Sequence, residues 1–252
     1  MNKIIIILSL TLFSVNIIKA GQGLSQDTLE QKNESLNYKS FIIPVILIGT
    51  GAFGIENDRF EIINAGVKEE VTENIDRHFS WDDLSQYAPA ISVNALNAMG
   101  IRGRNNLRNR TLILATSYIM MSTIVTELKI ITKVERPDKS AKNSFPSGHT
   151  ATAFWGAEFL WQEYKDVSVW YGISGYLVAA GTGFFRIYND RHWLTDVMAG
   201  AGIGMLTTKI AYLINPCLSR VLFKRNTSGQ TESIIYPYIR GQQFGVGIAL
   251  SF

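Results

Sequence analysis

The stretch SFPSGHTATAF, residues 144–154, places a histidine at the start of an apolar run that is rich in small residues. Ser147 is a residue type that caps the first turn of a helix, and Gly148 lets another molecule approach the backbone closely. The free amides at the start of a helix bind anions. His149 could then donate a proton to the group that leaves such an anion. The alternative is a helix cap with an incidental histidine.

Two cations precede this stretch. Lys129 and Arg136 are seven residues apart, which is two helical turns, so both side chains can point the same way. Pro137 ends that segment, and the short connection to His149 keeps both cations within reach of one pocket. Taken alone, the pair could instead be cations at a membrane edge, with their stems in lipid and their charges in water.

A third group of polar residues comes at FFRIYNDRHWLTDVMAG, residues 184–200. His192 and Asp196 are four residues apart, so the carboxylate can accept a hydrogen bond from one imidazole nitrogen. That bond fixes the tautomer and leaves the other nitrogen free as a nucleophile. Arg186 adds a cation beside them. A histidine–aspartate pair on a helix surface would have the same spacing without any chemistry.

Together the three groups predict phosphoryl chemistry. Lys129, Arg136 and Arg186 could neutralise the equatorial oxygens of a phosphoryl group. His192 could attack phosphorus while His149 protonates the leaving oxygen. No cysteine cluster accompanies them, so we predict a reaction without metal or other cofactor. The third histidine, at position 78 in an acidic segment, is expected to be solvated or structural.

The segments KIITKVERP, PSGH and RIYNDRHWLTD resemble, in this order, the three signature motifs of the type 2 phosphatidic acid phosphatase superfamily. This superfamily also includes bacterial class A acid phosphatases and vanadium haloperoxidases. The resemblance covers residues 129–196 and implies an α-helical bundle. The phosphate-binding residues that it implies are Lys129, Arg136, Ser147, Gly148 and Arg186. It also implies His149 as general acid, His192 as nucleophile and Asp196 as its partner.

One position departs from the family pattern. Phe185 stands where the family has a small serine before the arginine of the third motif. The change removes one possible hydroxyl contact to phosphate and leaves the nucleophile in place.

The elements that must position these residues are apolar blocks without strand alternation. The chain is therefore predicted to be all-α: a helical bundle of about five to six apolar, membrane-embedded helices with a short C-terminal β-like tail. A helix needs about 20 apolar residues to cross a bilayer, so the third, fifth and sixth blocks are the predicted spans. The blocks lie at about 41–55, 87–101, 111–126, 150–161, 168–185 and 197–214.

The ends of the chain differ from its middle. Residues 1–20 resemble a secretory signal peptide, with an uncleaved anchor as the alternative, and residues 21–40 form a polar linker. The helical phosphatase domain is predicted over 41–214 and a C-terminal tail over 215–252.

Within that tail, large and small side chains alternate from Tyr236 to the end of the chain. This pattern predicts one β-strand. We expect it to lie against the bundle, to pair with a short strand from residues 56–86, or to add to a sheet edge of another protein.

Loop charges suggest an orientation. The short connection 101–110 carries four arginines and no acid, whereas residues 56–86 are strongly acidic. Because basic loops stay in the cytoplasm, the site is predicted to face the periplasm from a bacterial inner membrane. A cleaved signal and two full spans before 101–110 would place the arginines outside, so block 41–55 is expected not to cross.

Apolar helices around the site favour a lipid phosphate as substrate, and a periplasmic site suits lipid A or undecaprenyl pyrophosphate. Phosphatidylglycerol phosphate, a soluble periplasmic acid phosphatase, a vanadate-dependent haloperoxidase and a catalytically idle membrane scaffold are the alternatives. A net charge of +3, without a basic stripe interleaved with aromatics, argues against nucleic acid. The single cysteine, Cys217, cannot form an internal disulfide. The oligomeric state is left open.

Overall fold

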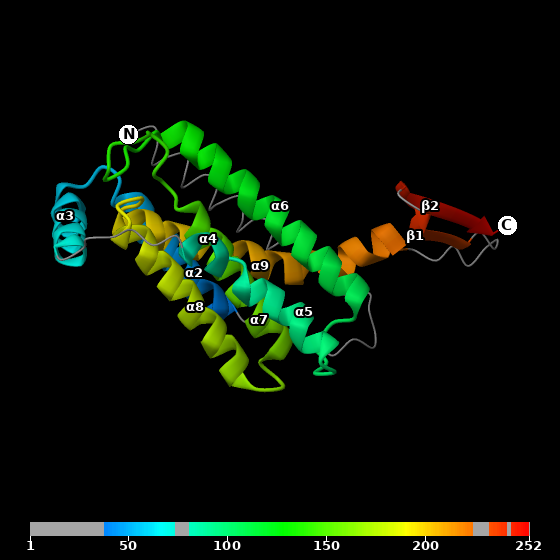
Figure 1. Ribbon diagram of the computed structural model, residues 1–252. Helices are drawn as coiled ribbons and strands as arrows, with labels where there is room; N and C mark the ends of the chain where they lie inside the picture. The colour runs from blue at the N-terminus through cyan, green and yellow to red at the C-terminus, as the bar shows by residue number, and fades with distance from the viewer. Residues whose placement is uncertain (1–37, 74–80, 224–231, 241–242, 252) are drawn as a thin grey trace. The chain divides into compact units, whose positions relative to one another are not determined.

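The structure is a computed structural model that describes residues 38–73, 81–223, 232–240 and 243–251 (Figure 1). The predicted signal peptide, most of the predicted linker and His78 lie outside these residues. The chain divides between Asn215 and Pro216 into two compact units. The first unit is helical, as the sequence predicts.

The α-helices of the described residues match the six apolar blocks and add two that were not predicted, and a short 3-10 helix, η2, precedes the first of them. They are η2 (Tyr38–Phe41), α2 (Ile42–Phe53), α3 (Asp58–Thr72), α4 (Trp81–Ser85), α5 (Ala88–Ala98), α6 (Leu107–Thr132), α7 (Gly148–Tyr164), α8 (Val169–Tyr188) and α9 (Leu194–Phe223).

The additional helices, α3 and α4, lie in the acidic segment that the sequence analysis interprets as a loop. That interpretation is wrong for its described parts. The Asn57 side chain caps α3 by accepting a hydrogen bond from the Arg59 amide at 3.0 Å. Asp58 and Glu61 lie in the first turn of α3, where negative charge is favourable to the helix dipole.

Helix α7 is the centre of the bundle. It contacts α4, α5, α6 and α8, and most of its residues are buried. Two of these buried residues are acidic. Glu158 accepts a hydrogen bond from Lys209 of α9 at 2.6 Å, and Glu163 accepts one from Tyr212 at 2.6 Å. Both of these buried carboxylates are thus hydrogen-bonded, as buried charges generally are.

Helix α9 packs on its neighbours through glycines. A methyl group on Gly204 would come 2.2 Å from the Ala151 carbonyl oxygen of α7, and one on Gly202 would come 2.6 Å from the Pro44 carbonyl oxygen of α2. Helix α2 contributes Gly51, where a methyl group would meet the Thr195 carbonyl oxygen at 2.6 Å. Small residues of this kind let helix backbones approach closely in membranes.

Two of the described helices, α6 and α9, are long and apolar enough to cross a membrane. Helix α8 falls short of that requirement, against the expectation, because glycines and tyrosines dilute its apolar residues. Helices α2 and α3 qualify only together, bent by 99°. Helix α2 alone has 12 residues, about 18 Å, and is too short to cross a hydrocarbon core of about 30 Å.

The second unit contains β1 (Glu232–Arg240) and β2 (Gln243–Ser251), which pair antiparallel with Glu232 opposite Ser251. The prediction of one continuous strand from Tyr236 is therefore wrong, and pairing of this tail with residues 56–86 stays a prediction. Large and small side chains alternate along both strands, and this alternation gives no signal for the point at which the chain reverses direction. Helix α9 also runs to Phe223, beyond the predicted start of the tail at 215.

Candidate active site

The loop between α6 and α7 and the loop between α8 and α9 meet at one end of the bundle. The Trp193 indole donates a hydrogen bond to the Glu135 carbonyl oxygen at 2.9 Å. The Ser147 amide donates to the Asp196 carbonyl oxygen at 3.0 Å. These contacts join the first, second and third motifs, which lie far apart along the chain.

The two cations of the first motif reach this end in different ways. Helix α6 ends at Thr132, where Lys133 adopts a left-handed conformation. Lys129 is therefore in the last turn of α6, but Arg136 lies beyond the helix, so the prediction that both share a helix face is wrong. Arg136 is held instead by a turn in which its amide donates to the Ala141 carbonyl oxygen at 3.0 Å. The Lys129 ammonium donates to the Asn143 carbonyl oxygen at 2.6 Å.

The second motif begins α7. Ser147 precedes the first helical residue, Gly148, and is fully buried. Its hydroxyl does not cap the helix, as the sequence analysis expects, but is 2.9 Å from the hydroxyl of Thr150. The backbone amides of the first turn retain the direction that suits an anion.

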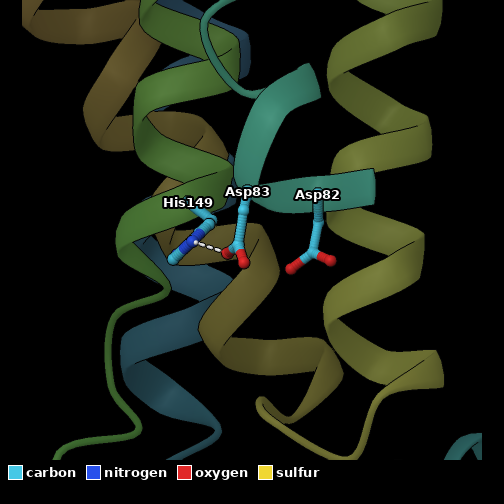
Figure 2. A group of neighbouring side chains, drawn as sticks. All are labelled: Asp82, Asp83 and His149. Carbon is cyan, nitrogen blue, oxygen red and sulfur yellow. Dashed lines mark hydrogen bonds and ion pairs between the residues drawn. The ribbon is translucent and has the colours of Figure 1, made fainter. Parts of the chain in front are cut away.

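His149 is in the first turn of α7 and faces α4. Its Nε2 lies 2.8 Å from Asp83 Oδ1, a contact that Figure 2 shows from the side. Burial and the nearby Arg186 lower the pKa of His149, while the hydrogen bond to Asp83 acts in the opposite direction.

Arg186, near the end of α8, forms an ion pair with the buried Asp82 of α4. The Asn189 amide donates to the other oxygen of Asp82 at 3.2 Å. The sequence analysis does not identify Asp82 or Asp83 as site residues, because they are two of many acids in residues 56–86. Their signal in the sequence is weak: an acidic pair between the apolar residues Trp81 and Leu84.

His192 is almost completely buried, and its Nδ1 lies 3.6 Å from Asp196 Oδ2. This separation is slightly too long for a hydrogen bond. The hydroxyl of Ser144 fits beside the pair: it donates to Asp196 Oδ2 and lies 3.4 Å from His192 Nδ1. Asp196 also accepts from the Trp193 amide at 2.9 Å. Ser144 is a further site residue that spacing did not reveal.

The electrostatics link these groups into one site. Burial, together with the charges of Lys129 and Arg186, lowers the pKa of His192 to about 4, against the effect of Asp196. Burial and Arg186 lower the pKa of Arg136 in the same way. Arg186 is therefore close enough to influence both histidines and Arg136.

Two arginines in the site each have a buried N–H group that makes no hydrogen bond to the described residues. Among the described residues, the Nε atoms of Arg136 and Arg186 are buried and have no hydrogen-bond partner. Buried polar groups are normally hydrogen-bonded, so these N–H groups indicate a missing acceptor. An anion with several oxygens would supply it.

Asp82, Asp83 and His149 also bring three possible metal-ligand atoms within 4.8 Å of one another (Figure 2). Both oxygens of Asp82 are already engaged, by Arg186 and Asn189, and Asp83 contacts His149. The group thus serves to balance the positive charge of the site. Metal independence stays a prediction.

The described helices and this site define a class: a helical bundle with membrane-length helices whose one end gathers cations, two histidines and a carboxylate for binding an anion. Residues 110–219 match the model of the PAP2 superfamily. The matched segment contains all three motifs, so this part of the chain is similar to the PAP2 superfamily.

The relatives agree with this assignment. The chain is 34% identical over 174 residues to a lipid A 1-phosphatase of Porphyromonas gingivalis. The match covers 66% of this chain and 39% of that protein, so the chain spans about two fifths of its relative's length.

Two solved structures are also similar. The crystal structure of Aquifex aeolicus LpxE is 24% identical with a TM-score of 0.46, over 60% of this chain and 94% of that one. A transmembrane PAP2 type phosphatidylglycerolphosphate phosphatase from Bacillus subtilis is 17% identical with a TM-score of 0.39, over 85% of this chain and 98% of that one.

Proposed function

We propose that this protein is a metal-independent phosphatase that removes a phosphate group from a lipid through a phosphohistidine intermediate. The observation that carries the proposal is the pair of unpartnered, buried Nε donors on Arg136 and Arg186 in the same site as two histidines. Donors fixed in a buried site stabilise the charge that develops on a phosphoryl group without further reorganisation.

In the first step, His192 attacks phosphorus. Its Nδ1 faces Asp196, which leaves Nε2 as the nucleophile. A pKa of about 4 keeps the ring neutral above that pH, so its lone pair is available. The bond from phosphorus to the leaving oxygen breaks as the bond to Nε2 forms, and His149 donates a proton to that oxygen.

In the second step, water replaces His192 on phosphorus. His149, now neutral, accepts a proton from the attacking water, and the bond between phosphorus and Nε2 breaks. Inorganic phosphate leaves, and both histidines return to their starting states. Lys129, Arg136, Arg186 and the first amides of α7 hold the phosphoryl oxygens throughout.

Arg186 can bind phosphate without leaving Asp82. Asp82 pairs with one terminal nitrogen of the guanidinium, and Nε has no partner among the described residues. Because a guanidinium has five N–H donors, one edge can be fixed by Asp82 while another binds the substrate. Asp82 acts here as a residue that positions Arg186.

Two observations support a lipid substrate at the periplasmic face. The arginine loop lies at the far end of α7 from His149, since the Arg104 amide donates to the Glu163 carbonyl oxygen at 3.0 Å. Helix α6 begins just after the arginine loop and ends just before the loop that leads to His149, and it is long and apolar enough to cross a membrane, so these two loops can lie on opposite sides of a bilayer. Arginines in the cytoplasm then place the site outside the inner membrane.

Lipid A phosphate is the proposed substrate, because the curated relative from Porphyromonas gingivalis is a lipid A 1-phosphatase. Undecaprenyl pyrophosphate and phosphatidylglycerol phosphate are the other candidates. A soluble phosphatase of broad specificity is disfavoured, since only 28% of the most apolar window of α6 is buried.

The test is an assay of the purified protein in EDTA on lipid A, undecaprenyl pyrophosphate, phosphatidylglycerol phosphate and p-nitrophenyl phosphate. We expect turnover with lipid A preferred, inhibition by vanadate, and complete loss in His192→Ala. His78→Ala is the matched control and should stay active. Activity that disappears on chelation and returns with divalent ions would contradict the metal-free mechanism.

A further inference from the structure

We propose that a groove between α4 and α8 binds an acyl chain of the lipid substrate and so sets the chain-length preference of the enzyme. The inference rests on the proposed function, because it names the part of the substrate that the groove holds.

The groove has an apolar lining and a volume of about 360 Å³. Helix α8 supplies one face through residues spaced three, four and seven apart, the spacing of a single helix face. The lining residues are Trp81 and Ser85 of α4 with Val178, Gly181, Thr182 and Phe185 of α8. The two hydroxyl groups are 2.8 Å apart and hydrogen-bond to each other, so they do not need a polar ligand.

The groove ends at the phosphate-binding residues. Phe185 is followed directly by Arg186, and Trp81 by Asp82, and these two polar residues form an ion pair. From Val178 to Arg186 the helix rises about 12 Å. A lipid with its phosphate at Arg186 could therefore lay the first part of a chain along the α8 face.

The chemistry of the groove fits a hydrocarbon chain. Its rim is open and apolar, with Trp81 65% and Val178 39% exposed. An apolar groove beside an anion site matches the two parts of a lipid phosphate, which are a charged head group and a hydrocarbon chain. Phe185 is also suited to line an acyl-chain groove, because it places an aromatic ring where the family has a serine hydroxyl.

Gly181 offers a direct test. A methyl group there would meet no atom within 4 Å, so a larger side chain fills the groove without displacing the bundle. Gly181→Leu should lower the ratio of kcat/KM for a long-chain lipid phosphate to that for p-nitrophenyl phosphate by about tenfold or more. Val178→Trp narrows the same groove and should act in the same direction.

Gly49→Leu is the matched control. Gly49 lies on α2, and a methyl group there also meets no atom within 4 Å. For Gly49→Leu, the ratio of kcat/KM for the long-chain lipid phosphate to that for p-nitrophenyl phosphate should equal the ratio of the unchanged protein. The proposal is overturned if Gly181→Leu leaves the ratio unchanged, or if it lowers activity on both substrates equally.

A binding experiment separates this inference from the catalytic one. A lipid phosphate with a photoreactive acyl chain should crosslink to peptides from α4 and α8, and Gly181→Leu should suppress those crosslinks. Crosslinking without turnover of any phosphate would uphold the groove and overturn the proposed function. Turnover of lipid phosphates with crosslinks confined to other helices would overturn the groove and leave the function standing.

Discussion

His149, the proposed general acid, contacts Asp83 of α4, a helix of five residues. Burial and Arg186 lower the pKa of His149, and the contact with Asp83 partly restores it. A general acid works only while it is protonated, so activity falls as pH rises through the pKa of His149. Asp83 should therefore extend activity toward higher pH.

Asp83→Asn is predicted to shift the basic limb of the pH profile of kcat/KM to lower pH, because the variant loses the charge that raises the pKa of His149. The acid limb should not move, since it reports His192, whose pKa is about 4. The loss at any one pH should stay below the 10²–10⁴-fold effect typical of removing a general acid.

The measurement is a full pH–rate profile of Asp83→Asn beside Asp166→Asn, which removes an exposed acid from the turn between α7 and α8. An unshifted profile with uniformly lower rates would show that Asp83 does not act through His149.

Among the elements, α9 positions the site by close backbone contact. A methyl group on Gly200 would come 2.4 Å from the carbonyl oxygen of Ser147, the residue that precedes α7. The same loop end is held by the hydrogen bond from the Ser147 amide to Asp196. The distance between Asp196 and the first amides of α7 thus depends on position 200 having no side chain.

Gly200→Ala is predicted to destabilise the fold by about 1–3 kcal/mol, because the backbone of α7 must shift. It should also lower kcat, since Ser147 and the first amides of α7 move with it. Gly49→Ala is the control, with open space around its new methyl group, and should be neutral or stabilise by up to about 1 kcal/mol.

Thermal unfolding in detergent and kcat on p-nitrophenyl phosphate provide the two measurements. Equal unfolding temperatures and rates for the two alanine variants would contradict the role assigned to Gly200.

For the molecule as a whole, orientation decides which substrates the site can meet. The arginine loop precedes α6 and the loop that contains Ser140 follows it, so the two loops should be on opposite sides of the membrane. Cysteine labelling can show which side is which. Cys217 is exposed and must first be changed to serine.

In that background, Ser140→Cys is predicted to react with an impermeant thiol reagent in intact cells, because Ser140 is exposed and the proposed orientation puts the loop before α7 in the periplasm. Arg102→Cys should be shielded until the membrane is opened. Arg102 is used because the neighbouring Asn105 holds Glu163 through a 2.7 Å hydrogen bond. The reverse labelling pattern would place the site in the cytoplasm.

The sequence by itself determined the class of fold and the three motifs. Apolar blocks without alternation predicted the helices because burial in a bundle or a bilayer requires continuous apolar faces. The order of the three motifs predicted the similarity to the PAP2 superfamily. Few other kinds of site combine lysine, arginine and histidine at these positions. These signals are local, and local patterns can be read along the chain.

The tertiary structure decided the rest. It placed Arg136 beyond the end of α6, put Ser144 beside His192 and Asp196, and brought Asp82 and Asp83 to Arg186 and His149. These contacts join residues that are 48 to 104 positions apart. No periodicity in the sequence records them, because each depends on how the bundle helices pack and where their connecting loops turn.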